Sequence, residues 1–314
     1  MRFRTEISIP KAGFNISHCD KLLLMGSCFA EYIGNKLEAS GFQADVNPFG
    51  VLYNPLSIAS GLRDLMQRKV FTEEDTVECN GLFSSWSHHS RFSDLTPSAC
   101  LKKIRERMEV SSVFLEQTSV LMVTFGTSYV YRLKKNGKLV SNCHKLPAGD
   151  FCRERLCMEE ILAEWSALAA DLRKKLPALN ILMTVSPIRH WKDGAHANQL
   201  SKSILLLAIE SLERQYDFIH YFPSYELILD DLRDYRFYAD DMLHPSSAAI
   251  DYIWEKFSAT HFDRATETAI NDYHRIRQDL EHRPSHPESE AYKTFRANAE
   301  KRLKAFRDKT DSFK

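Results

Sequence analysis

Short apolar runs alternate with longer amphipathic stretches along most of this chain. The runs at 21–25 (KLLLM), 119–126 (SVLMVTFG) and 180–187 (NILMTVSP) have the length and composition of buried strands, and 216–226 (YDFIHYFPSYE) contains a fourth. This alternation predicts a mostly parallel sheet covered by helices on both faces, which is the α/β class. Apolar residues recur at helical spacing between the strands, and we expect helices at 28–40, 56–69, 97–110, 156–175, 196–215 and 246–262.

One hairpin is expected inside this pattern. Two alternating runs flank Lys135-Asn136-Gly137, and an Asn-Gly pair between such runs suits a type I′ turn. Residues 83–95 lack a helical period, so we expect an extended segment or a loop there.

The composition of the chain changes near residue 263. The last stretch is rich in charged residues and is interrupted by Pro284 and Pro287. Proline ends helices, so the pattern favours two separate helices rather than one. We therefore expect an α/β domain at 1–262 and a helical C-terminal extension at 263–314 packed against it.

Composition excludes several function classes. Lys and Arg together number 42, as do Asp and Glu, so net charge gives no general attraction to nucleic acid or to an anionic membrane. No apolar run approaches the roughly 18–20 residues of a membrane span. The seven cysteines are scattered and form no CxxC pair, which favours reduced thiols in the cytoplasm over disulfides or a structural zinc. HExxH is also absent, so no metal site is predicted.

In an open α/β sheet, ligands bind beyond the carboxyl ends of the strands. Cys28 stands there, at the junction of the first expected strand and helix. Free backbone N–H groups at a helix start can lower the pKa of a thiol and make it a nucleophile. Gly26 would permit the tight turn, and Ser27 suits an N-cap. Alternatively, Cys28 is a small, inert residue that fills space in the core.

Asp241 and His244 precede the last helix of the sheet domain with the spacing DxxH. An aspartate at that spacing can hold one ring nitrogen of the histidine and leave the other free, as in a nucleophile–base–acid triad. The alternative is an aspartate that caps a turn beside a solvated histidine. A triad requires His244 Nε2 within about 4 Å of the nucleophile.

Several motifs in this order resemble the GSCFA family of bacterial proteins, a divergent branch of the SGNH/GDSL hydrolases. They are GSCFA (26–30), NPFGVLYNP (47–55), NCHKLP (142–147), TVSPI (184–188), SKS (201–203), YFPSYE (221–226) and DDMLHPSS (240–247). The resemblance implies a flavodoxin-like, three-layer α/β/α SGNH fold and ester or acyl-transfer chemistry. It gives no substrate.

The resemblance also implies roles for individual residues. Cys28 takes the nucleophile position of the SGNH Gly-Asp-Ser block, and Ser27 is the alternative nucleophile if the turn is shifted by one residue. Gly50 fits the second oxyanion donor of that superfamily. Gly126-Thr127 stands where the superfamily has Gly-x-Asn-Asp, so Thr127, Asn142 or Asn47 would replace the missing asparagine.

Other polar residues near the expected strand ends are candidates for substrate binding. His88-His89 and His144 would reach the site from loops, or would be hydrogen-bonded and surface histidines. Arg189, His190 and Lys192 follow the third strand and could hold an anionic group, or are solvated charges.

We expect an esterase or acyltransferase that acts on a small-molecule or glycan substrate without a cofactor. A thiol nucleophile suits thioester exchange, so acyl-CoA or another acyl donor is a candidate substrate. The alternative is a non-catalytic carbohydrate or ligand-binding module that keeps the SGNH fold.

Overall fold

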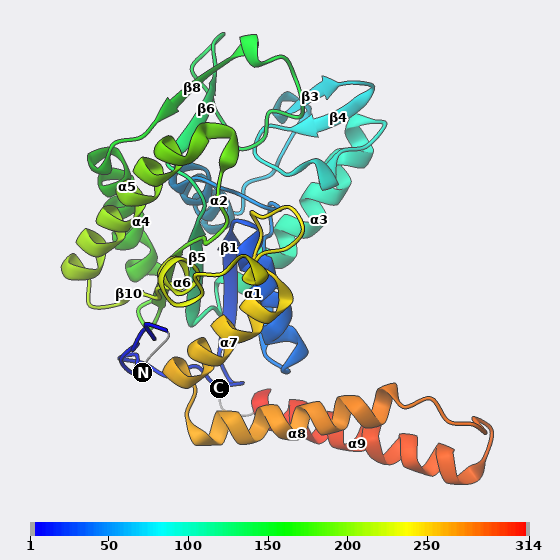
Figure 1. Cartoon of the computed structure of the whole chain (residues 1–314). Helices are drawn as coiled ribbons and strands as arrows, with labels where there is room; N and C mark the ends of the chain where they lie inside the picture. Colours follow the sequence, from blue (N-terminus) through cyan, green and yellow to red (C-terminus); the bar gives the residue numbers. More distant parts are fainter. Residues whose placement is uncertain (1–3, 312–314) are drawn as a thin grey trace.

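The computed structural model describes residues 4–311 (Figure 1). Its main sheet has five parallel strands in the order β10-β9-β5-β1-β2. When these five strands are renumbered 1 to 5 along the chain and read from the β2 edge, their order is 2-1-3-4-5, as in flavodoxin. The predicted fold class is therefore confirmed. The strands are β1 (Lys21–Gly26), β2 (Gln43–Val46), β5 (Val120–Phe125), β9 (Asn180–Val185) and β10 (Ile219–Tyr221).

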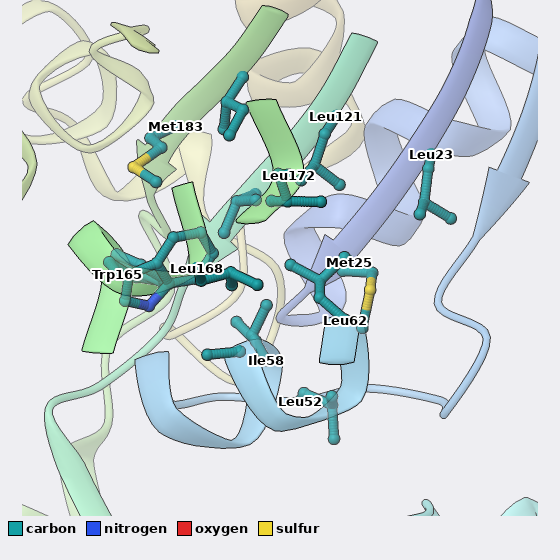
Figure 2. Packing of buried hydrophobic residues seen from close by; sticks show 14 of the residues in the cluster. Leu23, Met25, Leu52, Ile58, Leu62, Leu121, Trp165, Leu168, Leu172 and Met183 are labelled. Carbon is teal, nitrogen blue, oxygen red and sulfur yellow. The ribbon is translucent and has the colours of Figure 1, made fainter. Parts of the chain in front are cut away.

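The alternation of side chains along each strand divides the core into two layers. On β1, Leu23 and Met25 belong to one buried cluster, while Leu22 and Leu24 belong to the other. The first cluster includes residues of α2, α3, α4 and α5, and Figure 2 shows part of it, with Trp165 against the sheet. The second includes residues of α1 and α7. The sheet therefore lies between two helical layers.

The helices follow the expected pattern with small differences at their ends. The helix that begins at Pro97 starts where predicted but continues to Leu115, about a turn and a half beyond the expected end. The helix that begins at Ser247 is capped by Ser246, whose side chain accepts a hydrogen bond from the Ala249 N–H. The helices of the sheet domain are α1 (Cys28–Ala39), α2 (Pro55–Met66), α3 (Pro97–Leu115), α4 (Met158–Lys175), α5 (Gly194–Gln215), α6 (Ser224–Glu226) and α7 (Ser247–His261).

Two small antiparallel sheets lie outside the main one. β3 (Thr76–Cys79) pairs with β4 (Leu82–Ser85), and β6 (Tyr129–Leu133) pairs with β7 (Leu139–Val140) and β8 (Phe151–Arg155). The predicted hairpin around Asn136 is present, but its turn is not type I′. That turn needs positive φ at both central residues, and here Gly137 has φ 71° while Asn136 is not in the left-handed region.

The C-terminal extension is a pair of helices, α8 (Arg264–Glu281) and α9 (Glu290–Asp311), at the base of the view in Figure 1. It packs against the end of α1: a Cβ on Gly41 would lie 2.7 Å from the Tyr273 ring. Because α1 is 12 residues long, that contact lies roughly 18 Å from its first residue, Cys28. The extension therefore supports the end of the sheet domain opposite the candidate site.

Candidate active site

The turn between β1 and α1 presents Cys28 at the carboxyl end of the sheet. Gly26 has φ +146°, and its N–H donates to the Asn47 side-chain oxygen over 2.9 Å. Ser27 is the N-cap of α1; its hydroxyl accepts from the Phe29 N–H at 3.3 Å, and the residue is 1% exposed. Cys28 follows as the first residue of the helix and is partly exposed. Of the two candidate nucleophiles, only Cys28 can be reached from solvent without rearrangement.

Cys28, His244 and Asp241 form a continuous chain of contacts. The Cys28 Sγ lies 3.8 Å from His244 Nε2, and His244 Nδ1 lies 2.5 Å from Asp241 Oδ2. The other carboxylate oxygen of Asp241 accepts from the backbone N–H groups of Leu243 and His244, each at 2.9 Å. The Sγ–Nε2 separation is within the limit of about 4 Å that a nucleophile–base pair needs in a ligand-free protein.

The Asp241 carboxylate is fixed by local hydrogen bonds. The backbone N–H groups of His244 and Leu243, then the His244 side chain, lower the Asp241 pKa to about 2. Asp241 is therefore charged throughout the physiological range. It can hold His244 in the tautomer that carries hydrogen on Nδ1, which leaves Nε2 free to accept a proton from Cys28.

The Cys28 thiol is affected by opposing influences. Burial raises its pKa, and the Glu31 charge adds to the increase; the backbone N–H of Cys28 itself and the Lys202 charge act in the opposite direction. The net shift is upward, contrary to the lowering expected from the helix start alone. The resting group is thus a neutral thiol whose proton must pass to a base when the sulfur attacks.

We expect the iodoacetamide alkylation of Cys28 to have its pH midpoint above that of an ordinary thiol, about 8.5, because burial disfavours the thiolate. Rates at each pH, mapped by peptide mass spectrometry, give the midpoint. In the protein unfolded by urea, the same cysteine should return to the ordinary value. A midpoint below 8.5 in the folded protein would show instead that a thiolate–imidazolium pair exists at rest.

The structure does not support Gly50 as an oxyanion donor. Its N–H donates to the Asn47 carbonyl over 2.8 Å and is therefore already used. Gly50 has φ +77°, and a Cβ there would lie 2.2 Å from the Cβ of His89. The glycine is needed so that His89 can pack on this turn. His89 in turn donates its backbone N–H to the Phe49 carbonyl, and its ring accepts from the Arg91 N–H.

The backbone donors of Gly126 and Thr127 are also occupied. Both N–H groups donate to the Tyr53 carbonyl, over 2.7 and 2.9 Å, and the Thr127 hydroxyl is 3.1 Å from that of Ser201. Asn142 is engaged as well: its amide nitrogen contacts Ser90, and its oxygen accepts from the His144 N–H. The backbone amides of Gly126 and Thr127 are therefore not the free donors expected from the resemblance, and the Asn142 amide nitrogen has one of its two N–H groups engaged with Ser90.

His144 and Asn47 have structural partners rather than contacts with Cys28. His144 is buried, and its Nε2 is 2.8 Å from the Ser85 carbonyl oxygen. Asn47 is 1% exposed; its side-chain oxygen fixes the Gly26 N–H, and its amide nitrogen is buried without a hydrogen-bond partner. His88 is fully buried against Phe49, and burial lowers its pKa to about 3, so it is neutral.

Lys202 lies in the SKS motif at 201–203, but no role was predicted for this residue from the sequence. It is fully buried, and its Nζ donates to the carbonyls of Gly126 and Ser186 over 2.6 and 2.7 Å. It thereby joins the ends of β5 and β9 beside β1. A signal was present in the sequence, since Lys202 occupies the apolar stripe of α5 together with Leu205 and Ile209.

His190 approaches the same strand end from the loop after β9. Its Nε2 is 3.3 Å from the position that a Cβ on Gly126 would take, and its ring meets Tyr53 edge-on at a centroid distance of 5.5 Å. Burial, assisted by the Lys202, Arg153 and His244 charges, lowers the His190 pKa to about 4. A neutral imidazole can donate one hydrogen bond without carrying charge.

Within residues 4–311, no three His, Cys, Asp or Glu side chains are grouped as metal ligands would be. All seven cysteines are free thiols. None of the helices in the described part of the chain is both long and apolar enough to cross a bilayer.

Comparison with known proteins identifies the family of the chain. The GSCFA family model matches residues 21–257, and the model of the GSCFA domain protein C-terminal domain matches residues 273–314. No curated protein matches the sequence significantly.

Among solved structures, similar chains include carbohydrate esterases. A family 3 carbohydrate esterase of Clostridium thermocellum has 10% identity and a TM-score of 0.36, covering 76% of this chain and 95% of its own. One from Talaromyces cellulolyticus has 8% identity and a TM-score of 0.36, covering 81% and 99%. An acetyl xylan esterase of Butyrivibrio proteoclasticus has 11% identity and a TM-score of 0.35, covering 76% and 64%. Similarity at this level says nothing about the activity of this chain.

Proposed function

The chain belongs to the GSCFA family, and from its site we propose that it is an acyl-transfer enzyme that cleaves an ester, thioester or O-acyl group. The observation that supports this most is the contact chain from the Cys28 sulfur through His244 to Asp241. A nucleophile, a base and a group that orients the base are the parts that nucleophilic acyl transfer requires.

In the first step, the Cys28 sulfur attacks the acyl carbonyl carbon while His244 Nε2 takes the thiol proton. The carbonyl π electrons move to the oxygen and give a tetrahedral oxyanion. When that intermediate collapses, the bond to the leaving oxygen or sulfur breaks, and His244 returns the proton to the leaving group. The products are an acyl thioester on Cys28 and a free alcohol or thiol.

In the second step, water or an acceptor hydroxyl attacks the thioester and gives its proton to His244. Collapse of the new intermediate breaks the carbon–sulfur bond, and the proton returns to Cys28. Water yields a carboxylic acid, and a hydroxyl acceptor yields a new ester. Asp241 stays ionised throughout and stabilises the imidazolium that forms in each step.

Two groups are candidates to stabilise the oxyanion. The backbone N–H of Cys28, at the first position of α1, has no acceptor within the helix. The second is His190, in the neutral tautomer that carries hydrogen on Nε2, because that atom lies against Gly126 at the end of β5. It would replace the asparagine of the SGNH pattern by a donor from a different strand end.

The substrate is a small molecule or a glycan that carries an acyl group, and an acyl-CoA or another thioester is the candidate donor. A thiol nucleophile exchanges readily with thioesters, and no cofactor is needed. Free thiols suit a reducing compartment such as the cytoplasm.

Trapping the acyl enzyme tests this function. The intact protein is mixed with p-nitrophenyl acetate or acetyl-CoA, and its mass is followed with time by mass spectrometry. We expect a transient increase of one acetyl group located on Cys28. If no acyl group transfers from a panel of esters, thioesters and O-acyl sugars, the alternative is a ligand-binding module; the occupied amides of Gly50, Gly126 and Thr127 favour it.

Asp241→Asn should lower the rate of acyl transfer by about tenfold to a thousandfold, because an amide in this position no longer selects the correct His244 tautomer. The rate is measured with the acyl donor found by trapping. Asp240→Asn is the matched control: it makes the same charge change one residue away, at an exposed side chain, and should leave the rate unchanged. Equal rates in both variants would remove Asp241 from the mechanism.

A further inference from the structure

Two basic side chains, Lys202 and Arg189, lie at the ends of β5 and β9 without a carboxylate partner in the described part of the chain. Lys202 is fully buried, with two carbonyl oxygens as acceptors of its Nζ and no carboxylate within ion-pair distance in the described part of the chain. Burying a charge without an opposite charge is costly, and this burial is the main reason that the Lys202 pKa is lowered to about 7, so Lys202 is only partly charged near neutral pH. This cost calls for an explanation from the site around it.

Arg189, three residues after Ser186 in the same loop, adds a positive charge on a partly buried side chain. Its Nε is buried without a hydrogen-bond partner, and its guanidinium carbon lies 5.1 Å from the centre of the exposed Trp191 ring. No carboxylate between residues 4 and 311 forms an ion pair with it. Burial is the largest cause of the lowered Lys202 pKa; the Cys28 charge acts in the opposite direction, and the positive charge of Arg189 lowers the Lys202 pKa further.

Both charges act on the groups of the candidate active site. The Lys202 charge reaches Cys28 and His190. The Arg189 charge reaches Tyr238, and the residue after Tyr238, Ala239, donates its N–H to the His244 carbonyl over 2.8 Å. The charge of Arg189, in the loop after β9, therefore reaches the hairpin that carries His244.

The acidic groups around Cys28 do not neutralise these cations, because each has another partner. Glu31 lies 3.5 Å from Arg91, and Asp241 is held by His244. Further along the loop, Asp193 pairs with Arg153. A bound anion would therefore give Arg189 the partner that it lacks and would favour the charged form of Lys202.

We propose that Arg189 and Lys202 form an anion subsite beside Cys28, and that the acyl compound bound there carries a carboxylate or a phosphate. The planar guanidinium of Arg189 would bind the anion directly through its free N–H groups. Lys202 has no exposed surface and cannot touch the ligand; it fixes the ends of β5 and β9, and in its charged form it adds long-range attraction. That the anionic ligand is an acyl compound depends on the proposed function, whereas the binding of an anion at this subsite does not.

The test compares alkylation of Cys28 by iodoacetate, which is an anion, with alkylation by neutral iodoacetamide. The rate with iodoacetate is divided by the rate with iodoacetamide at each cysteine, as measured by peptide mass spectrometry. The exposed Cys19 and Cys152 of the same molecule serve as internal controls. We expect the ratio to be higher at Cys28 than at the two controls. In Arg189→Gln, the ratio at Cys28 should fall roughly three- to tenfold while the controls stay unchanged.

Two further variants separate charge from folding. Arg189→Lys keeps the charge and should keep most of the ratio. Arg236→Gln makes the same change at an exposed arginine on the segment just before the His244 hairpin, and it should have no effect. Should Arg189→Gln fail to fold, the Lys variant and the wild-type comparison with Cys19 and Cys152 still decide the question.

The chemical source of the anion is distinguished by protection. Acetate or inorganic phosphate is added at constant ionic strength, with chloride as reference, and the iodoacetamide alkylation rate of Cys28 is followed. Slowing by acetate indicates a carboxylate ligand, and slowing by phosphate indicates a phosphate ligand. The subsite would be overturned if the ratio at Cys28 equals that at Cys19 and Cys152, does not change in Arg189→Gln, and neither anion protects Cys28 from iodoacetamide.

This outcome is independent of catalysis. If the Cys28 ratio responds to Arg189→Gln but no ester or thioester is cleaved, the anion subsite stands and the acyl-transfer proposal fails. If esters are cleaved while the ratio does not respond, the acyl-transfer proposal stands and the subsite fails.

Discussion

Cys28→Ala is expected to reduce acyl transfer by about a thousandfold or more, because removal of a nucleophile leaves only binding and oxyanion stabilisation. The sulfur is the only atom of this side chain that can attack, and His244 Nε2 lies 3.8 Å from it. The variant should fold normally, since Cys28 is partly exposed. The initial rate of p-nitrophenyl acetate hydrolysis and the loss of the acetyl adduct measure the effect.

Ser27→Ala is the paired variant because Ser27 was the alternative nucleophile. Its hydroxyl caps α1, and the residue is 1% exposed. Losing a serine N-cap costs about 1 kcal/mol of stability, so we expect a lower urea midpoint together with nearly normal acyl transfer. The opposite pattern, with an active Cys28→Ala and an inactive Ser27→Ala, would assign the chemistry to Ser27 and contradict the proposal.

The local part of the site was predictable from the sequence because its signals are local. The junction of strand and helix at Gly26–Cys28 follows from periodicity and capping. The Asp241–His244 contact follows from a three-residue spacing within one turn. The contact of Cys28 with His244 spans 216 positions, and it was expected only because both stretches lie at the carboxyl ends of the sheet.

The remaining features depend on contacts that no local pattern encodes. β2 was not predicted, because it has only four residues, its apolar residues Ala44 and Val46 are too few to form a recognisable pattern, and its one buried residue is the charged Asp45, which pairs with Arg107. The amides of Gly126 and Thr127 are occupied by the Tyr53 carbonyl, a partner more than 70 residues away. A motif places a residue in the chain but does not show which acceptors surround it.

Gly26→Ala should be the most damaging substitution at the site for stability, with a loss of about 3 kcal/mol or more in the free energy of unfolding. A Cβ at this position would lie 2.2 Å from the Thr124 carbonyl oxygen and 2.9 Å from two further backbone atoms of Thr124. The φ of +146° also disfavours any residue with a side chain. Urea unfolding followed by circular dichroism measures the loss.

The Thr124 backbone cannot give way easily, because Gly26 and Thr124 are paired across β1 and β5, and the same Thr124 oxygen accepts the Ser27 N–H. Separating the strands would therefore also move Cys28 away from His244. Gly149→Ala is the control: a Cβ there would meet nothing within 4 Å, and its change should stay within about 0.5 kcal/mol. If Gly26→Ala unfolds at the wild-type urea concentration, the turn is not the rigid support that presents Cys28, and its position must be set by the helix instead.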